Sequence, residues 1–417
     1  MSQSLAAGAP ARRFGWYRGW SMVGLCLLAQ MMGLGLATNC FTLFLDTWSR
    51  EFHAPISSIA LAMTVFSISC APFCAAAGWA ADKFSVRWMF ALGLLLIAAA
   101  QVAVGFVHAV QPLIALYVVL AVGVTFSTSI PAQALVARWF VQRRGLALGI
   151  SMFGITAAGM VFPPIVLAMT GAVGWRMTWF IFSGVIALVV VPLLLLTVRD
   201  RPDPESAASP YLKGAGEAAA TGPTLTTREI LSRPAFWIIG LSFLTAFMVF
   251  MGVTVNLKPL VMSHGLTAWD AGLLISAIAV VDLMGKVVSG LVVDRLGPRA
   301  PLAAVCLIAA LAAAWLGLAQ GAPAVVAGFL ALGLVSAIWT PMAAAVAIEF
   351  GQNNFGRAFG IINVFATFPT VAAPVLAWTR EQTGSYSAGL LGLAVLAFLG
   401  ALLALALKPP KAPLTAA

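Results

Sequence analysis

Twelve apolar segments, each close to the length needed to cross a bilayer, follow one another along the 417-residue chain. They are bounded by charged residues, Pro or Gly, which mark the ends of helices. A helix needs about 20 apolar residues to span the hydrocarbon core, whereas the strands of a membrane barrel are shorter and alternate in polarity. The pattern therefore predicts an all-α membrane protein with twelve transmembrane helices. The predicted spans are residues 19–44, 56–78, 88–107, 112–137, 146–170, 178–198, 235–257, 271–293, 300–319, 324–348, 358–379 and 387–407.

The two halves of the chain repeat each other. The segment GWAADKFSVR, which begins at Gly78, matches GLVVDRLGPR, which begins at Gly290, at an offset of 212 residues. RRGLALGI around Gly145 matches FGRAFGII around Gly356 at an offset of 211. Matching segments separated by an even number of spans have the same orientation, so the repeat is parallel. Two six-helix halves with a binding site between them are a transporter architecture.

One long polar segment separates the two halves. Residues 199–234 are rich in Ala, Ser, Pro, Gly and Thr, which is typical of a linker. We therefore predict an N-terminal six-helix half over residues 1–198, a cytoplasmic linker over 199–234 and a C-terminal six-helix half over 235–417. Near the end of the linker, Thr226 is expected to begin a short surface helix before Pro234.

The composition excludes several classes of function. Apolar residues make up 62% of the chain and charged residues only 9%, whereas a soluble domain of this size covers its surface with polar groups. The sequence lacks the glycine-rich phosphate loop of ATP-driven pumps. No cysteine or histidine has the spacing of a metal or redox site, so we expect no enzymatic activity, no metal and no cofactor. The five cysteines lie in apolar segments, where packing explains them: Cys26, Cys40, Cys70, Cys74 and Cys306.

The net charge of +10 follows the topology of the spans. With the N-terminus inside, eighteen of the 23 Lys and Arg residues fall in the cytoplasmic segments. The segments on the other side hold only Arg50, Arg176, Lys258 and Arg380. Because cytoplasmic loops carry the excess of basic residues, both termini are predicted to be cytoplasmic. The distribution of basic residues therefore indicates insertion in a lipid bilayer and does not indicate binding to nucleic acid.

Asp282 and Lys286 are the only charged residues within the twelve predicted spans. A charge near the bilayer centre costs about 2.5–3.5 kcal/mol on insertion scales. Residues four apart share one face of a helix, so each of these two can offset part of the other's cost. A pair in this setting is by default a functional site, either an anchor for an anionic substrate, a carrier of protons, or both.

Two short charged turns, after the second and eighth predicted spans, match each other in the repeat. Glycine permits close approach of helices, and aspartate can cap or pair with a neighbouring helix end. The turns could therefore hold one conformation of a rocking protein, or they could be solvated charges that only set the topology. The candidate gate residues are Gly78, Asp82, Lys83 and Arg87 in the first turn, and Gly290, Asp294, Arg295 and Arg299 in the second.

The paired turns resemble the signature loop of the major facilitator superfamily, and this resemblance covers nearly the whole chain. Ser85 stands where that signature usually has glycine. Within the superfamily the chain is similar to bacterial monocarboxylate transporter homologues. Three features carry the similarity: GWYRGW at residues 15–20, which lacks the family's acidic start, RWFVQRRGLALG at residues 138–149, and the pair of Asp282 and Lys286 in the eighth span.

Two departures from the monocarboxylate transporter pattern bear on the site. The family's substrate-binding arginine is Lys286 here. Lysine is a point donor, whereas arginine binds a carboxylate through two parallel hydrogen bonds. Asn39 stands where animal members carry a lysine in the first span. Asn39 could line the cavity or serve polar packing between helices, and Trp339 lies where members place an aromatic side chain beside the substrate, although ordinary packing explains it equally well.

The resemblance implies a monomeric secondary transporter in the bacterial inner membrane. It would move a small monocarboxylate together with a proton by alternating access, with Lys286, Asn39 and Trp339 binding the organic-acid anion and Asp282 carrying the proton. One alternative is an exchanger of organic anions or dicarboxylates anchored at Lys286. A second is a membrane sensor of the same fold that transports nothing, which the absence of a large soluble signalling domain disfavours.

Overall fold

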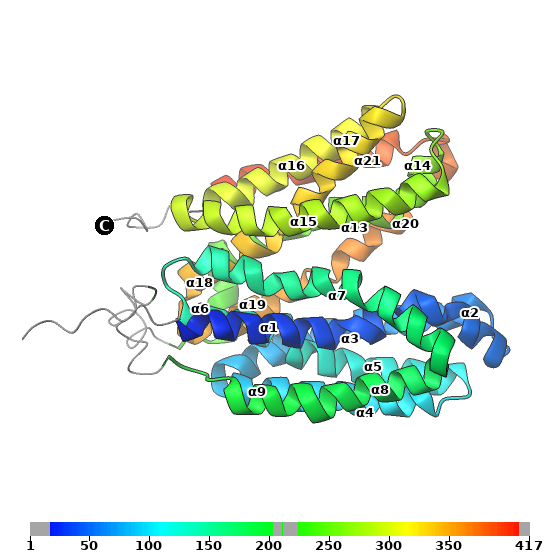
Figure 1. Cartoon of the computed structure of the whole chain (residues 1–417). Coiled ribbons are helices and arrows are strands. Elements are labelled where there is room, and N and C mark those ends of the chain that lie inside the picture. The colour runs from blue at the N-terminus through cyan, green and yellow to red at the C-terminus, as the bar shows by residue number, and fades with distance from the viewer. Residues whose placement is uncertain (1–16, 203–210, 212–223, 408–417) are drawn as a thin grey trace, which may run out of the picture.

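The computed structural model describes residues 17–202, 211 and 224–407, and these residues form a bundle of helices without strands (Figure 1). Twelve helices or interrupted helices in this part of the chain are long and apolar enough to cross a membrane. The prediction of an all-α protein with twelve spans is therefore confirmed. Residues 1–16, which include the first two residues of the aromatic opening, and most of the predicted linker lie outside the described residues.

The first six spans are formed by eleven helical segments. They are α1 (Arg18–Leu34), a π-helical segment (Gly35–Asn39) and α2 (Phe41–Glu51) in the first span; α3 (Ile56–Lys83) in the second; α4 (Val86–Gly105) in the third; α5 (Val110–Ser127) and α6 (Ser129–Trp139) in the fourth; α7 (Arg144–Val173) in the fifth; and α8 (Trp175–Val185), a second π-helical segment (Ile186–Val190) and α9 (Val191–Thr197) in the sixth.

The short helix α12 (Thr227–Ser232) precedes the remaining six spans, as predicted from the sequence. Thr226 and Glu229 form a reciprocal capping box at its start. The helices that follow are α13 (Pro234–Val255) and α14 (Leu257–Met262), α15 (Ala268–Leu296), α16 (Arg299–Leu318), α17 (Ala322–Val335) and α18 (Trp339–Phe350), α19 (Phe355–Val364) and α20 (Ala372–Thr383), and α21 (Ser387–Leu405). Short 3₁₀ segments at Ser336–Ile338, Gln352–Asn354 and Phe368–Val371 join some of them.

The fourth and tenth spans are both interrupted near their middle, and proline explains the position of each break. Pro131 lies in the first turn of α6 and Pro341 in the first turn of α18. Proline lacks an N–H group and its ring clashes with the carbonyl of the residue four positions earlier. Four positions before these prolines are Ser127, the last residue of α5, and Ala337, within the 3₁₀ segment.

The first span also departs from the regular α-helix, at the π-helical segment Gly35–Asn39. One of its backbone carbonyls is bound by a neighbouring helix, because the hydroxyl of Tyr117 in α5 donates to the carbonyl of Ala37 at 3.0 Å. Helix α7 packs close by, since a Cβ at Gly35 would come within 2.8 Å of the Phe162 ring. Single π-helical turns occur frequently at functional sites, and this one ends at Asn39.

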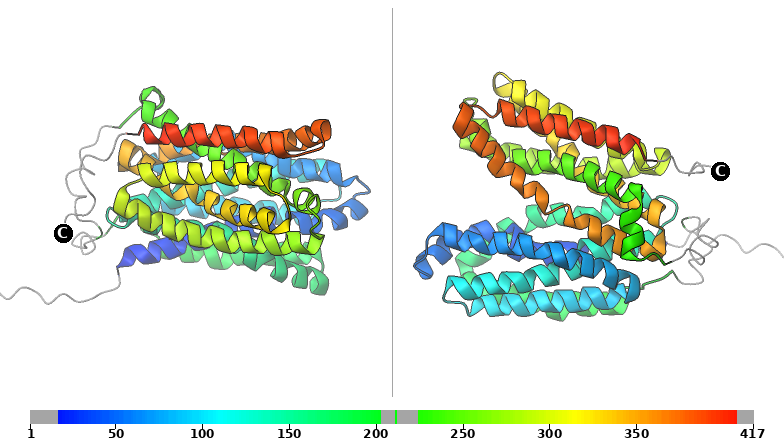
Figure 2. Two further views of the ribbon diagram at one scale, coloured as in Figure 1. Left: turned by 90° about the horizontal axis from the view of Figure 1, so that it is seen from above. Right: turned by 180° about the vertical axis from the view of Figure 1, so that it is seen from behind.

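Two groups of helices meet mainly along two contacting pairs. The first six spans (blue to green) and the last six (green to red) form separate groups in Figure 1 and in the right view of Figure 2. Between the groups, α7 packs against α15, and α3 packs against α19. We call the end of the bundle where α1 begins and α21 ends the terminal end; α3 finishes there and α7 begins there. Both pairs make their closest contacts near this end, and α7 with α15 also encloses the buried charges.

Candidate functional site

Asp282 and Lys286 form an ion pair inside the protein. Both lie on α15, and the Nζ of Lys286 is 2.8 Å from the Oδ2 of Asp282. Asp282 is 9% exposed and Lys286 is 5% exposed. The one-turn spacing seen in the sequence therefore brings the two charges into direct contact. Buried charges are stable only when they are paired and hydrogen-bonded, and further polar groups complete this pair.

Thr156 contributes to the pair from the opposite group of helices. Its hydroxyl on α7 donates to the Oδ2 of Asp282 at 2.7 Å and accepts from the Nζ of Lys286 at 2.7 Å. The three groups thus form a closed ring of hydrogen bonds. Because α7 and α15 belong to different groups of helices, the ring bridges the interface between them.

Ser336 completes the coordination of the carboxylate. Its hydroxyl donates to the Oδ1 of Asp282, so both oxygens of the carboxylate accept hydrogen bonds. Ser336 is the first residue of the 3₁₀ segment that interrupts the tenth span, immediately before α18. The break that Pro341 imposes on the helix therefore lies beside the ion pair.

The repeat shows that this charge pair belongs to one half of the chain. At the offset of 212 residues that relates the two charged turns, Asp282 corresponds to Cys70 and Lys286 to Cys74. The backbone packing around these positions is nevertheless similar. A Cβ at Gly149 would come within 2.5 Å of the Lys286 carbonyl, and one at Gly360 would come within 2.4 Å of the Cys74 carbonyl. The halves thus share their close contacts here but not their charges.

Asn39 and Trp339 do not hydrogen-bond to the ion pair. Asn39 ends the π-helical segment of the first span, and its Nδ2 is buried without a hydrogen-bond partner among the described residues. Trp339 is half-buried and packs edge to face against Phe243 and Phe247, with ring centroids 4.7 Å and 5.5 Å apart. Trp339 directly follows the 3₁₀ segment that carries Ser336. Trp339 thus makes aromatic packing contacts, and the buried amide of Asn39 keeps a donor without a partner among the described residues.

At the terminal end, two aspartates bind helix N-termini across the interface. Asp82 accepts the backbone N–H groups of Gly356 and Arg357 at the start of α19, at 2.7 and 2.8 Å. Helix N-termini carry unpaired N–H groups and partial positive charge, so a carboxylate is stabilised there.

Asp294 makes the matching contact in the other direction. It accepts the N–H groups of Gly145 and Leu146 at the start of α7, at 2.6 and 3.0 Å. The residues bound by Asp82 and Asp294 are related by the repeat offset of 211. We refer to these two contacts as the carboxylate caps. They join the two groups of helices through charge-assisted hydrogen bonds.

Glycines bring the backbones close enough for the carboxylate caps to form. A Cβ at Gly78 would lie 2.2 Å from the Gly356 carbonyl, and a Cβ at Gly290 would lie 2.6 Å from the Gly145 carbonyl. Reciprocal clashes would arise from a Cβ at Gly145 or Gly356. The crossing points of α3 with α19 and of α7 with α15 therefore exclude any side chain larger than hydrogen.

The basic residues of the two turns lie apart from the carboxylate caps. Lys83 is exposed and lies over the Trp79 ring, 4.6 Å from its centroid, and the backbone N–H of Arg87 donates to Asp200 at 3.2 Å. Arg295 is exposed and Arg299 begins α16. Among the described residues, no hydrogen bond or ion pair joins any of these four side chains to the opposite group of helices.

Sequence reasoning placed Asp282 beside Lys286 but did not identify Thr156 or Ser336. The two aspartates at equivalent places of the repeat were identified, while their partners were not. A hydroxyl residue in an apolar span is common, and nothing in its local pattern distinguishes a ligand of a buried charge from a packing group. Their roles depend on which helices lie face to face.

Comparisons with known proteins are consistent with this architecture. A family model described as the Major Facilitator Superfamily matches residues 23–374 and 271–417. Monocarboxylate transporter 12 of Xenopus laevis is 24% identical over 399 residues, which cover 90% of this chain and 85% of that protein. A probable sulfoacetate transporter, SauU of Cupriavidus necator, is 26% identical over 382 residues, with coverage of 86% and 87%.

A solved structure shares the fold. The crystal structure of a Major Facilitator Superfamily transporter, FucP, in the outward conformation has a TM-score of 0.71 to this chain at 16% sequence identity. The match covers 93% of this chain and 99% of that one. At this identity the likeness concerns the arrangement of helices alone.

The carboxylate caps generate a prediction about closure of the terminal end. Asp82→Ala or Asp294→Ala removes two hydrogen bonds to a helix N-terminus, which destabilises the closed arrangement by about 2 kcal/mol. A cysteine introduced at the buried Ala137, with the native cysteines replaced, reports on opening through its rate of modification by a water-soluble maleimide. We expect faster labelling and slower transport in both variants.

The matched control for this experiment is Asp270→Ala. Asp270 also caps a helix N-terminus, but it lies within α15 at the far end and binds Thr267 of the same segment. Its loss should leave the labelling of the introduced cysteine unchanged. Unchanged or slower labelling in both Asp82→Ala and Asp294→Ala would exclude a role of the carboxylate caps in closure.

Proposed function

The chain belongs to the Major Facilitator Superfamily, and on that premise we propose that it is a secondary transporter that moves a small monocarboxylate together with a proton. Membership of this superfamily, expected from the charged turns, is confirmed by the family model, and it makes the chain a multi-pass membrane transporter. An organic-acid substrate is supported by relatives named for a monocarboxylate and for sulfoacetate. The observation that carries the proposal is the buried pair of Asp282 and Lys286.

In this proposal Lys286 is the anchor of the substrate. Its ammonium is buried and already holds a carboxylate, that of Asp282, at 2.8 Å. An organic-acid anion offers the same chemical group and can take the place of Asp282. Charge-assisted hydrogen bonds of this kind contribute about 1.5–3 kcal/mol each. One interior cation fits one carboxylate, which favours a monocarboxylate.

Charge balance explains why a proton accompanies the anion. The empty site is neutral, because Asp282 and Lys286 cancel. Binding of an anion alone would leave one net negative charge at a depth where a charge costs about 2.5–3.5 kcal/mol. Uptake of one proton by Asp282 restores neutrality, since the substrate then balances Lys286. The two neutral forms, empty and doubly loaded, are the ones that can reorient across the membrane.

The transport cycle follows from these two neutral forms. From the outward side a substrate carboxylate replaces Asp282 at Lys286, and a proton from solution binds to the released Asp282 carboxylate. The two halves then rock about the site, which requires the carboxylate caps to separate. On the other side Asp282 releases its proton, recovers Lys286 and displaces the substrate. In this cycle Thr156 remains hydrogen-bonded to Lys286 while the carboxylates exchange, because its hydroxyl contacts both charged groups from the other half.

Asn39 and Trp339 complete the proposed cavity. The unpaired Nδ2 of Asn39 is a buried donor, and such a group costs about 1–3 kcal/mol unless a ligand or water satisfies it. We assign it a second contact with the substrate carboxylate. Trp339 presents an aromatic wall beside the 3₁₀ segment, suited to the apolar part of a small acid. The transporter is proposed to work as a monomer in the inner membrane of a bacterium with both termini cytoplasmic.

The first prediction from this mechanism concerns Lys286. Lys286→Ala removes the anchor and should weaken carboxylate binding by roughly 10- to 100-fold, which corresponds to one charge-assisted hydrogen bond. Lys286→Arg should retain part of the binding, because the charge persists. The measurement is uptake of a labelled monocarboxylate into proteoliposomes, with binding followed by thermal shift across a panel of organic acids. Wild-type uptake by Lys286→Ala would falsify the anchor role.

The second prediction concerns coupling through Asp282. Asp282→Asn keeps the shape of the side chain but cannot carry the proton. The substrate-loaded variant is neutral, whereas the empty one holds an unpaired cation and reorients poorly. We therefore expect exchange of labelled for unlabelled substrate to persist, and accumulation driven by an inward proton gradient to be lost.

The same assay on the wild-type protein distinguishes the alternatives. A symporter accumulates substrate under a pH gradient with no substrate inside the vesicle, an exchanger requires internal substrate, and a sensor shows neither activity. Accumulation by Asp282→Asn at the wild-type level would remove Asp282 as the proton carrier.

The third prediction concerns Thr156 as a positioning residue. Thr156→Val removes the hydroxyl that orients Lys286 while preserving side-chain volume. The concentration for half-maximal exchange should rise about 2- to 10-fold, as expected for the loss of one hydrogen bond. Thr156→Ser should restore it. Thr170→Val is the control on the same helix, because the Thr170 hydroxyl is buried and has no partner in the described residues. Equal effects of the two valine substitutions would exclude a specific role for Thr156.

A further inference from the structure

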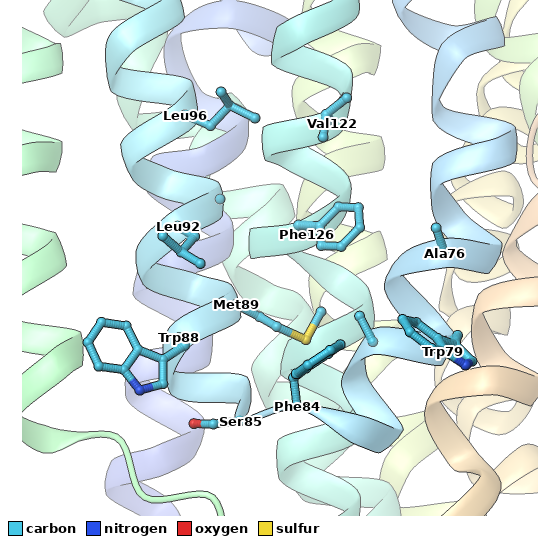
Figure 3. Close-up of a pocket in the computed structure, with 12 residues that line it drawn as sticks. Ala76, Trp79, Phe84, Ser85, Trp88, Met89, Leu92, Leu96, Val122 and Phe126 are labelled. Atoms are coloured by element: carbon cyan, nitrogen blue, oxygen red, sulfur yellow. The ribbon is translucent and has the colours of Figure 1, made fainter.

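An apolar groove opens on the outer surface of the first six spans, near the terminal end (Figure 3). It has a volume of about 490 Å³ and is lined by side chains of α3, α4 and α5, with the turn between α3 and α4 at one end. This size lies in the range of small-molecule sites, about 300–1,000 Å³. Three aromatic side chains form its wall toward the terminal end: Trp79, Phe84 and Trp88, which are 42%, 57% and 54% exposed.

The end of the groove at the turn is basic. The Nζ of Lys83 lies 4.6 Å from the centroid of the Trp79 ring, and the guanidinium of Arg87 lies 6.0 Å from the centroid of the Trp88 ring. Neither side chain forms an ion pair with a carboxylate in the described part of the chain. The Nε of Arg87 is buried and has no hydrogen-bond partner there. Two cations thus lie over the rings of the aromatic wall, and neither has a carboxylate partner among the described residues.

Two carboxylates lie close to this end, and both already have hydrogen-bond partners. Asp200 accepts the hydroxyl of Ser85 and the backbone N–H of Arg87, so it caps the start of α4. The other nearby acid, Asp82, binds the N-terminus of α19. Both acids are therefore engaged by backbone groups, and neither forms an ion pair with the side chain of Lys83 or Arg87, which lie over the rings of Trp79 and Trp88.

The second half of the chain has the same charges but not the aromatic wall. At the repeat offset of 212, Lys83 and Arg87 correspond to Arg295 and Arg299. Trp79, Phe84 and Trp88 correspond to Leu291, Leu296 and Ala300. Carboxylate caps form in both halves, but the aromatic wall is present only in the first half. The aromatic wall is therefore not needed for the caps and calls for another explanation.

We propose that this groove is a binding site for an anionic phospholipid of the surrounding bilayer. One acyl chain occupies the apolar groove along Leu92, Leu96 and Val122, and the phosphodiester binds Lys83 and Arg87. Tryptophan is enriched at the level of the lipid headgroups, which places the aromatic wall at the depth this requires. Basic residues near a membrane surface each contribute about fivefold to the binding of anionic lipid, whereas a neutral lipid or sterol would leave both cations unused.

The site also adjoins the carboxylate cap of the first half. Lys83 directly follows Asp82, and the groove wall ends where α3 meets α19. A bound headgroup holds Lys83 and the end of α3 in place, and it thereby favours the arrangement in which Asp82 reaches the start of α19. The lipid is thus expected to stabilise closure at the terminal end.

The experiment is a lipid titration of the purified full-length protein in detergent, followed by its melting temperature. Dioleoyl phosphatidylglycerol is compared with dioleoyl phosphatidylcholine, which has the same chains and no net charge. A ligand that binds the native state raises the melting temperature with concentration. We expect the anionic lipid to act at a concentration about 25-fold lower, from two cations at about fivefold each, and this preference to shrink at high salt.

Three variants locate the site. The double variant Lys83→Ala with Arg87→Ala should lose the preference for the anionic lipid. Its matched control, Arg295→Ala with Arg299→Ala, removes the corresponding charges from the second half and should retain it. Ala76→Phe fills the groove from α3, keeps both cations and should weaken stabilisation by either lipid. Melting temperatures without lipid show that each variant is folded.

Several outcomes would overturn the proposal. Equal stabilisation of the wild-type protein by the two lipids would mean that the groove does not select an anionic headgroup. Retention of the preference in Lys83→Ala with Arg87→Ala, or an equal loss in the control pair, would place the effect elsewhere on the surface. Full stabilisation of Ala76→Phe would show that no acyl chain enters the groove.

Discussion

The requirement that a charge inside a membrane be balanced governs the centre of this molecule. Asp282 and Lys286 satisfy it for each other, and Thr156 and Ser336 supply the hydrogen bonds that the pair still needs. A buried ion pair of this kind contributes little to stability, because the loss of hydration offsets much of the attraction between the charges. The proposed mechanism gives the pair a different role, which is to exchange partners. In that mechanism the site is neutral when empty, and it becomes neutral again when a carboxylate and a proton have both bound.

The same helix pair carries both the ion pair and one of the carboxylate caps. On α15, Gly290 lies one turn beyond Lys286, and Asp294 lies one turn beyond Gly290. On α7, Gly145 and Gly149 pack against this stretch, and Thr156 reaches the charges two turns further on. Helices in such close contact move as rigid elements, since glycine leaves no side chain to absorb a displacement. In the proposed mechanism, a change of partner at Lys286 would therefore act on the same helix pair whose contact at the terminal end has to open.

The sequence specified those parts of the structure that depend on periodicity and on charge. Span number followed from hydrophobic length, and the Asp282–Lys286 contact followed from a spacing of one helical turn. Gly78 and Gly290 occupy equivalent positions of the repeat, and this recurrence predicted a close helix crossing at each. Thr156, Ser336 and the groove beside Trp79 were not predictable in this way. They arise where helices distant in sequence come together, and serine, threonine and tryptophan occur in apolar spans for many other reasons.

The repeat separates what the two halves share from what each half does alone. The shared residues are those of the contact surface: glycines at the crossings and aspartates at the helix ends, arranged so that each half caps the other. The residues that differ include the buried charges, since Cys70 and Cys74 stand where Asp282 and Lys286 stand in the second half. A second ion pair would add another pair of buried charges at the cost of their desolvation, and in the proposed mechanism it would require a second anion and proton before the site became neutral. Symmetric contacts with asymmetric charges are therefore what the proposed mechanism needs, namely a single charged site between two halves that cap each other.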